Sequence, residues 1–189
     1  MAAAEAGADA LGFMFYAGSK RNITPGEAET IIRELPPFIA RVGVFVDSDA
    51  SFVRQSVAAS GIDTLQFHGR ETPEFCGQFG LKVLKAFRIR DRASLEECRH
   101  YDRYAWLLDS HVDGAIGGTG VPFDWDVAAE ATRLSRHVIL AGGLKVETVA
   151  EAVRRVRPYG VDVSSGVESA PGRKDHGRLR EFIAAARGA

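Results

Sequence analysis

One acidic residue ends a short apolar run. Asp109 directly follows Leu107 and Leu108, and we expect these apolar residues to form a buried strand. A carboxyl group at the end of such a strand is well placed to act as a general acid or base. The same residue could also be a helix cap or a salt-bridge partner, and the run by itself leaves these alternatives open.

Two later apolar runs end in small residues. The first ends in Ala141-Gly142-Gly143-Leu144 and the second in Ser164-Ser165-Gly166-Val167. At such turns, backbone N–H groups can approach a ligand closely because no bulky side chain intervenes. Two such turns on consecutive units suit a phosphate group. The alternative is two tight connections that require glycine and bind nothing.

Two charged residues are candidates for binding polar parts of a substrate. Arg21 ends the segment Ser19-Lys20-Arg21 and could form a bidentate pair with a carboxylate or a phosphate. The alternative is a solvated surface charge. Asp162 could bind a sugar hydroxyl, and its alternative is a buried carboxylate satisfied by backbone donors.

A histidine and a glycine-rich segment complete the candidates. His68 ends Gln66-Phe67-His68-Gly69, and its imidazole could titrate near neutral pH, although a structural or orienting role is the stronger expectation. The segment Gly117-Gly118-Thr119-Gly120 could close over a ligand. The alternative for this segment is a plain surface loop.

These residues need elements to position them, and the chain alternates apolar runs with helical patterns. Thr24 to Glu27 forms a capping box with Pro25 at the first helical position. Strict alternation of strand and helix implies a parallel sheet, either open and doubly wound or closed into a barrel. The predicted strands are Ala10–Phe15, Ile39–Val46, Thr64–Phe67, Lys82–Phe87, Ala105–Leu108, Val138–Ala141 and Gly160–Ser164. Other predicted helices cover 49–59, 72–79, 124–134, 146–156 and 175–186.

Seven such units favour an α/β fold of the (β/α)8 TIM-barrel type in which the first strand and most of the first helix are missing. Residues 1–189 would form a single domain, because no linker rich in Gly, Ser or Pro divides them. The opening residues, up to Gly7, are rich in alanine and are typical of the end of a helix. In a barrel, functional residues lie where the strands end and in the loops that follow.

Composition excludes several classes of partner. Lys and Arg number 24 against 25 Asp and Glu, for a net charge of −1, so we expect neither nucleic acid nor a membrane surface as a partner. The two cysteines, Cys76 and Cys98, lie in predicted helices without metal-type spacing. Few cysteines and no signal-peptide pattern favour the cytoplasm. We expect a monomer, with a homodimer as the alternative.

The ordered set of motifs resembles the phosphoribosylanthranilate isomerase family over nearly the whole chain. Each motif is weak by itself, whereas the ordered set is specific. The matching stretches are Ala8-Asp9-Ala10-Leu11-Gly12-Phe13, Ser19-Lys20-Arg21, Arg41-Val42-Gly43-Val44-Phe45-Val46, Gln66-Phe67-His68-Gly69, Leu107-Leu108-Asp109, Gly117-Gly118-Thr119-Gly120, Phe123-Asp124-Trp125, Ala141-Gly142-Gly143-Leu144 and Asp162-Val163-Ser164-Ser165-Gly166-Val167-Glu168.

The resemblance implies an Amadori rearrangement of N-(5′-phosphoribosyl)anthranilate in tryptophan biosynthesis, without metal or organic cofactor. Asp109 would be the general acid that protonates the ribose ring oxygen, and Arg21 would hold the anthranilate carboxylate. Asp162 would contact the opened sugar. The remaining implied substrate contacts are Gly118 and the phosphate-binding residues Gly142, Gly143, Ser165 and Gly166.

The family's general base is a cysteine in a Lys-x-Cys-Gly segment on the first strand, and this sequence has no such segment. The resemblance therefore implies a chain that begins inside the first helix. One alternative is a catalytically inactive barrel fragment. Another is a neighbouring phosphate-binding barrel such as tryptophan synthase α or indole-glycerol-phosphate synthase, against which the ordered motifs argue.

Overall fold

The computed structural model describes residues 1–110 and 125–189. The chain divides into two compact units, Met1–Lys85 and Ala86–Ala189. The strand β4 (Lys82–Ile89) contributes its first half to one unit and its second half to the other.

The first unit is built on parallel strands that pair in chain order. These are β1 (Ala10–Met14), β2 (Ala40–Phe45), β3 (Thr64–Phe67) and the start of β4. One row across this sheet joins Met14, Val44, Gln66 and Leu84. The predicted strands in this part of the sequence are thus confirmed, and their carboxyl ends lie along one edge.

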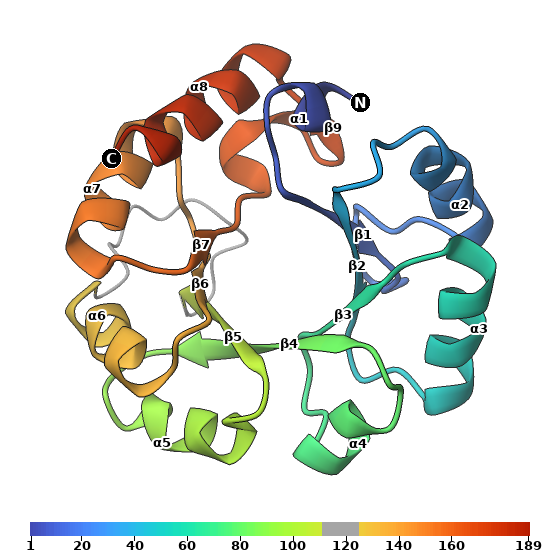
Figure 1. The fold of residues 1–189 in the computed structure, drawn as a ribbon, viewed down its shortest axis with the longest axis horizontal. Coiled ribbons are helices and arrows are strands. Elements are labelled where there is room, and N and C mark those ends of the chain that lie inside the picture. Colours follow the sequence, from blue (N-terminus) through green and yellow to red (C-terminus); the bar gives the residue numbers. More distant parts are fainter. Residues whose placement is uncertain (111–124) are drawn as a thin grey trace. The chain divides into compact units, whose positions relative to one another are not determined.

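Helices α2 (Pro25–Arg33), α3 (Ala50–Ser60) and α4 (Pro73–Gly77) follow β1, β2 and β3 (Figure 1). Thr24, Asp49 and Thr72 cap them with side-chain oxygens, each accepting a backbone N–H of the first turn. The predicted capping box at Thr24 is confirmed. Before β1, the short helix α1 (Ala2–Glu5) is followed by the positive-φ residue Gly7, so the predicted helix end in this segment is confirmed.

Aromatic packing shows which face of the parallel sheet in the first unit the helices cover. The ring of Phe45 packs edge-on against Phe52 of α3, with centroids 6.3 Å apart. Phe67 packs in the same way against Phe75 of α4 at 5.6 Å. Side chains alternate between the two faces of a strand, so the row that contains Val44 and Gln66 faces away from these helices.

The second unit continues with parallel strands β5 (Ala105–Ser110), β6 (Val138–Leu140) and β7 (Gly160–Val161). The helices α6 (Trp125–Leu134), α7 (Val146–Val156) and α8 (His176–Arg187) belong to this unit (Figure 1). Phe87 of β4 packs edge-on against Trp106 and Tyr101.

The helix α5 (Ser94–Cys98) contains Cys98, which the sequence already places in a helix. The 3₁₀ helices η1 (Arg99–Tyr101) and η2 (Ser165–Val167) were not predicted, and neither was the hairpin formed by β8 (Glu168–Ala170) and β9 (Arg173–Lys174). Each is too short to carry a hydrophobic period. The strand β7 is also shorter than the predicted run Gly160–Ser164. No helix in the described ranges is long and apolar enough to cross a membrane.

Candidate active site

In the second unit, strand register places two carboxylates on one face. Leu107 pairs with Ile139, and Ile139 with Gly160. Two residues further along each strand, Asp109, Ala141 and Asp162 lie on the same face. The pairing reaches this level, because the N–H of Ala141 donates to the Leu108 carbonyl and that of Asp162 to the Leu140 carbonyl, both at 2.8 Å.

The sheet face that carries these carboxylates also carries a cluster of buried apolar side chains. Ala86, Leu107 and Ala141 form a buried cluster there, with Ile139 packed against it. Asp109 is half-buried. Two strand spacings, about 10 Å between Cα atoms, separate it from Asp162.

Asp162 differs from two expectations. It follows β7 rather than lying within a strand, and its side chain is exposed. The alternative of a buried carboxylate satisfied by backbone donors is therefore wrong. The Asp162 N–H still pairs with β6, and the chain then turns into the η2 segment, which leaves Asp162 at the strand end.

The two glycine turns meet at the same end of the sheet. Gly142 and Gly143 have φ values of 78° and 70°, which L-residues with a side chain rarely adopt. Gly166 lies against the Leu144 carbonyl so closely that a β-carbon at this position would clash with it. The turn that carries Ser165 and Gly166 is therefore in direct contact with the turn that carries Gly142 and Gly143.

The β8–β9 hairpin holds the second of these turns in place. The Lys174 ammonium donates to the Ser164 carbonyl at 2.9 Å and pairs with the buried Glu168 carboxylate at 3.1 Å. The Asp175 N–H donates to the Val167 carbonyl at 2.8 Å. These contacts fasten both ends of η2 and so fix the direction of the Ser165 and Gly166 amides.

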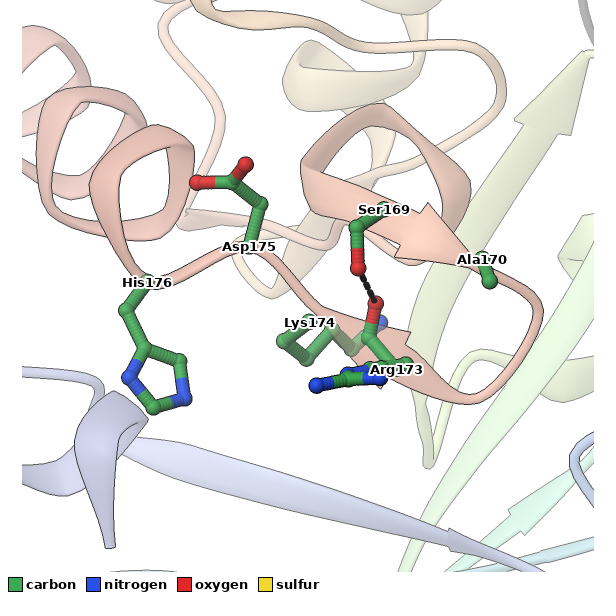
Figure 2. Close-up of a pocket in the computed structure, with 6 residues that line it drawn as sticks. All are labelled: Ser169, Ala170, Arg173, Lys174, Asp175 and His176. Atoms are coloured by element: carbon green, nitrogen blue, oxygen red, sulfur yellow. Dashed lines mark hydrogen bonds between the residues drawn. The ribbon is translucent and has the colours of Figure 1, made fainter.

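Figure 2 shows an open polar pocket beside this hairpin, lined by Ser169, Ala170, Arg173, Lys174, Asp175 and His176. The Ser169 hydroxyl donates to the Arg173 carbonyl at 3.2 Å and closes the hairpin. The Asp175 carboxylate caps α8 by accepting the N–H groups of Arg178 and Gly177, and these bonds hold its pKa below the usual range. Asp175 thus acts as the N-cap of α8, the helix that follows the turn with Ser165 and Gly166.

In the first unit, Arg21 lies on the segment between β1 and α2. This segment folds back on its strand, since the Ile23 N–H donates to the Met14 carbonyl at 3.0 Å. The Arg21 N–H donates to the Ser19 hydroxyl at 3.1 Å. Arg21 is half-buried rather than fully solvated.

The same unit contains a buried ion pair that sequence reasoning missed. Lys85 of β4 and Glu71, after β3, are 2% and 3% exposed, and their charged atoms lie 3.5 Å apart. The available signal was a lysine inside the apolar run Lys82–Phe87. Because long polar side chains are rarely fully buried unless paired, such a lysine calls for an acidic partner.

Neither cysteine is arranged for catalysis. Cys76 lies in α4 and Cys98 in α5, both buried and free, so the prediction that both lie in helices is confirmed. Burial raises the pKa of the Cys76 thiol to about 12. A thiol with this pKa is a poor base near neutral pH. Gly118 and the rest of the predicted Gly117–Gly120 loop lie outside the described residues.

The family model for N-(5′-phosphoribosyl)anthranilate (PRA) isomerase matches residues 1–185. The chain belongs to this family. An isomerase of this name from Geobacter sulfurreducens is 52% identical over 188 residues, which cover all of this chain and 92% of that protein.

Solved structures give the same result for the fold. The phosphoribosyl anthranilate isomerase of Thermotoga maritima is 39% identical with a TM-score of 0.94, over all of this chain and 92% of that one. A second structure of an isomerase of this family, in complex with reduced 1-(o-carboxyphenylamino)-1-deoxyribulose 5-phosphate, is 38% identical, covers the same shares of the two chains and has a TM-score of 0.90. These likenesses confirm the predicted (β/α)8 barrel class.

Proposed function

We propose that this chain isomerises N-(5′-phosphoribosyl)anthranilate to 1-(2-carboxyphenylamino)-1-deoxyribulose 5-phosphate in tryptophan biosynthesis, with Asp109 as the general acid. The observation that carries the proposal is the placement of Asp109 on the same face and at the same strand level as Asp162, in the unit that also brings two glycine turns together. Membership in the isomerase family supplies the reaction.

The chemistry needs an acid and a base but no external oxidant or reductant. Asp109 donates a proton to the ribose ring oxygen as the bond from that oxygen to C1 breaks, and the nitrogen lone pair forms an iminium ion. A base then removes the C2 proton to give an enolamine. Tautomerisation leaves a ketone at C2, so that C2 is oxidised while C1 is reduced within one molecule.

The anionic ends of this substrate fit the other candidates. We assign the phosphate to the backbone amides of Gly142, Gly143, Ser165 and Gly166, because small residues leave these amides open to a close approach. Asp162 is assigned to the hydroxyl groups of the opened sugar. Arg21 is assigned to the anthranilate carboxylate, which its guanidinium can bind through two parallel hydrogen bonds. We keep Gly118 as a further substrate contact.

Neither of the two cysteines in this sequence is suited to act as the base. Both cysteines are buried, and the Cys76 thiol has a raised pKa. We propose that the C2 proton is taken by a cysteine in a Lys-x-Cys-Gly strand that is additional to these 189 residues. The alternative is a barrel that binds the substrate without turning it over.

One experiment tests both the function and the source of the base. The chain is assayed alone and with the Lys-x-Cys-Gly strand of a relative added before Met1. We expect turnover of phosphoribosylanthranilate only in the extended protein, and loss of that turnover when the added cysteine is changed to serine. Turnover by the chain alone would refute the assignment of the base, and no turnover by either protein would favour the inactive barrel.

We further propose that the protein is a cytoplasmic monomer and that residues 1–189 form one domain. The two free, buried cysteines suit a reducing compartment. A single cooperative unfolding transition and a monomeric mass by light scattering are the expected results. Two separate transitions would refute the single domain, and a dimer mass would favour the homodimer.

A further inference from the structure

The buried cation Lys85 contacts the backbone on both sides of His68. Its ammonium donates to the Gly69 carbonyl at 2.7 Å and, more weakly, to the Phe67 carbonyl at 3.4 Å. The His68 N–H donates to the Phe45 carbonyl at 2.8 Å. The main chain at His68 is therefore tied to both neighbouring strands.

Glu71 secures the residues that follow. One carboxylate oxygen accepts the Gly69 N–H at 2.9 Å, and the other accepts the Asp47 N–H at 2.8 Å. Asp47 in turn accepts the Arg70 N–H at 2.7 Å. The segment after β3 is thus fastened to the segment after β2 in both directions.

Close packing at Gly69 shows how tightly these two segments fit. A β-carbon at Gly69 would lie 2.7 Å from the backbone nitrogen of Asp47, which real contacts do not allow. Asp47 itself has a φ of 48°, a conformation that costs free energy for a residue with a side chain. The surrounding hydrogen bonds keep this conformation in place.

The ion pair and the histidine lie on opposite faces of the sheet. Lys85 pairs in register with Phe67, whose ring packs against α4, so Lys85 faces the helices. His68 is one residue further along and faces the other side. There its ring nitrogen Nδ1 lies 3.3 Å from the amide nitrogen of Gln66.

A buried ion pair seldom adds net stability, because the desolvation of both charges offsets their attraction. The geometry points to a different use. We propose that Lys85 and Glu71 are positioning residues that fix His68 at the carboxyl end of β3 for contact with the substrate, on the sheet face that points away from α3 and α4. The identity of the ligand in this inference rests on the proposed function. The effect of Lys85 and Glu71 on His68 does not depend on it.

The test uses two variants and a matched control. Glu71→Gln removes one charge of the pair. The double variant Glu71→Gln, Lys85→Met leaves no charge unpaired, so it is expected to fold even where the single variant does not, and it cannot bind the two carbonyls. Asp63→Asn is the control, since Asp63 pairs with Arg41 at 2.7 Å near the amino-terminal ends of β2 and β3.

The first readout is the imidazole resonance of His68 by NMR, assigned with a His68→Asn variant. The four other histidines serve as internal references. In Glu71→Gln and in the double variant, we expect the His68 resonance to shift and to broaden, with the other histidines unchanged. In Asp63→Asn, the His68 resonance should stay at its wild-type position. An unshifted His68 resonance in the folded double variant would overturn the proposal.

The second readout is the Kd of the reduced product analogue named above. We expect at least a fivefold weaker Kd in the double variant and a change below twofold in Asp63→Asn. Wild-type affinity in the double variant would also overturn the proposal. If the wild-type chain fails to bind the analogue, the proposed function is refuted, and the His68 resonance still decides whether Lys85 and Glu71 act as positioning residues.

Discussion

The segments that follow the strands are held differently in the two units. In the first unit, the loops after β2 and β3 are joined by the buried Lys85–Glu71 pair and by side-chain bonds to backbone amides. In the second unit, the turns after β6 and β7 meet through glycine and backbone, with Gly166 against the Leu144 carbonyl.

This difference suits two kinds of ligand contact. Glycine turns leave backbone amides open, which is what a phosphate needs. A side chain such as His68 instead requires its main chain to be fixed, because a small rotation of the backbone moves the tip of the ring. Charged side chains in the first unit and open glycine turns in the second are therefore two means of holding the segments that follow parallel strands.

The largest effect should come from a substitution of Asp109 in the second unit. This substitution should lower the rate of the chemical step without weakening ligand binding. We expect Asp109→Asn to lower kcat by about 10²–10⁴-fold, the usual contribution of general acid catalysis. Steady-state kinetics would measure kcat, on the chain alone or on the extended protein, depending on which of them is active. The Kd of the product analogue is the control and should change little. A loss of kcat below about tenfold would remove Asp109 from the role of acid.

Arg21 tests whether the first unit contributes a charged contact to the ligand. Arg21→Ala should weaken binding of the product analogue by about 1.5–3 kcal/mol, which is about ten- to a hundredfold in Kd. Calorimetric titration measures this, and Lys20→Ala, one exposed residue earlier, is the matched control. Equal Kd values for the two variants would mean that Arg21 is only a surface charge.

Gly166 tests the contact between the two turns. A β-carbon there would meet the Leu144 carbonyl, so Gly166→Ala should lower the free energy of unfolding by about 1–3 kcal/mol and also weaken binding of inorganic phosphate. Gly26→Ala is the control, since nothing lies within 4 Å of its β-carbon position. Urea unfolding should show no loss of stability for this control. Equal stabilities for both variants would contradict the close approach of the turns.

The smallest effect concerns Asp63, whose ion pair lies away from the functional edge. Burial alone would raise its pKa, but hydrogen bonds from Arg41 and Thr64 outweigh this and hold the pKa below the usual range. Its stabilisation is therefore present above about pH 4 and is lost as the pH falls through the lowered pKa.

For a pair this exposed, the difference in unfolding free energy between wild type and Asp63→Asn should be about 0.2–1 kcal/mol at pH 7. Urea unfolding at pH 7 and at pH 3 measures the two values. A difference that stays constant down to pH 3 would contradict the assignment.

The sequence by itself determined the order of strands and the positions of the candidate residues. Continuous apolar runs identify strands buried on both faces, and capping residues such as Thr24 and Asp49 mark where helices begin. The period of two along a strand then places Asp109 at a strand end. These signals are local, since each depends on residues close together in the chain.

Tertiary structure alone decided how those residues are held. Lys85 and Glu71 are 14 positions apart in the sequence. A lysine in an apolar run calls for an acidic partner, but no pattern identifies Glu71 as that partner. Gly166 and Leu144 are brought together only by the register of β6 and β7. The exposure of Asp162, just after β7, is likewise not evident from the sequence. Each of these features depends on contacts between segments that are far apart in the sequence. Such contacts form only when the whole chain folds, because the free energy of the complete fold, and not that of one segment, stabilises them.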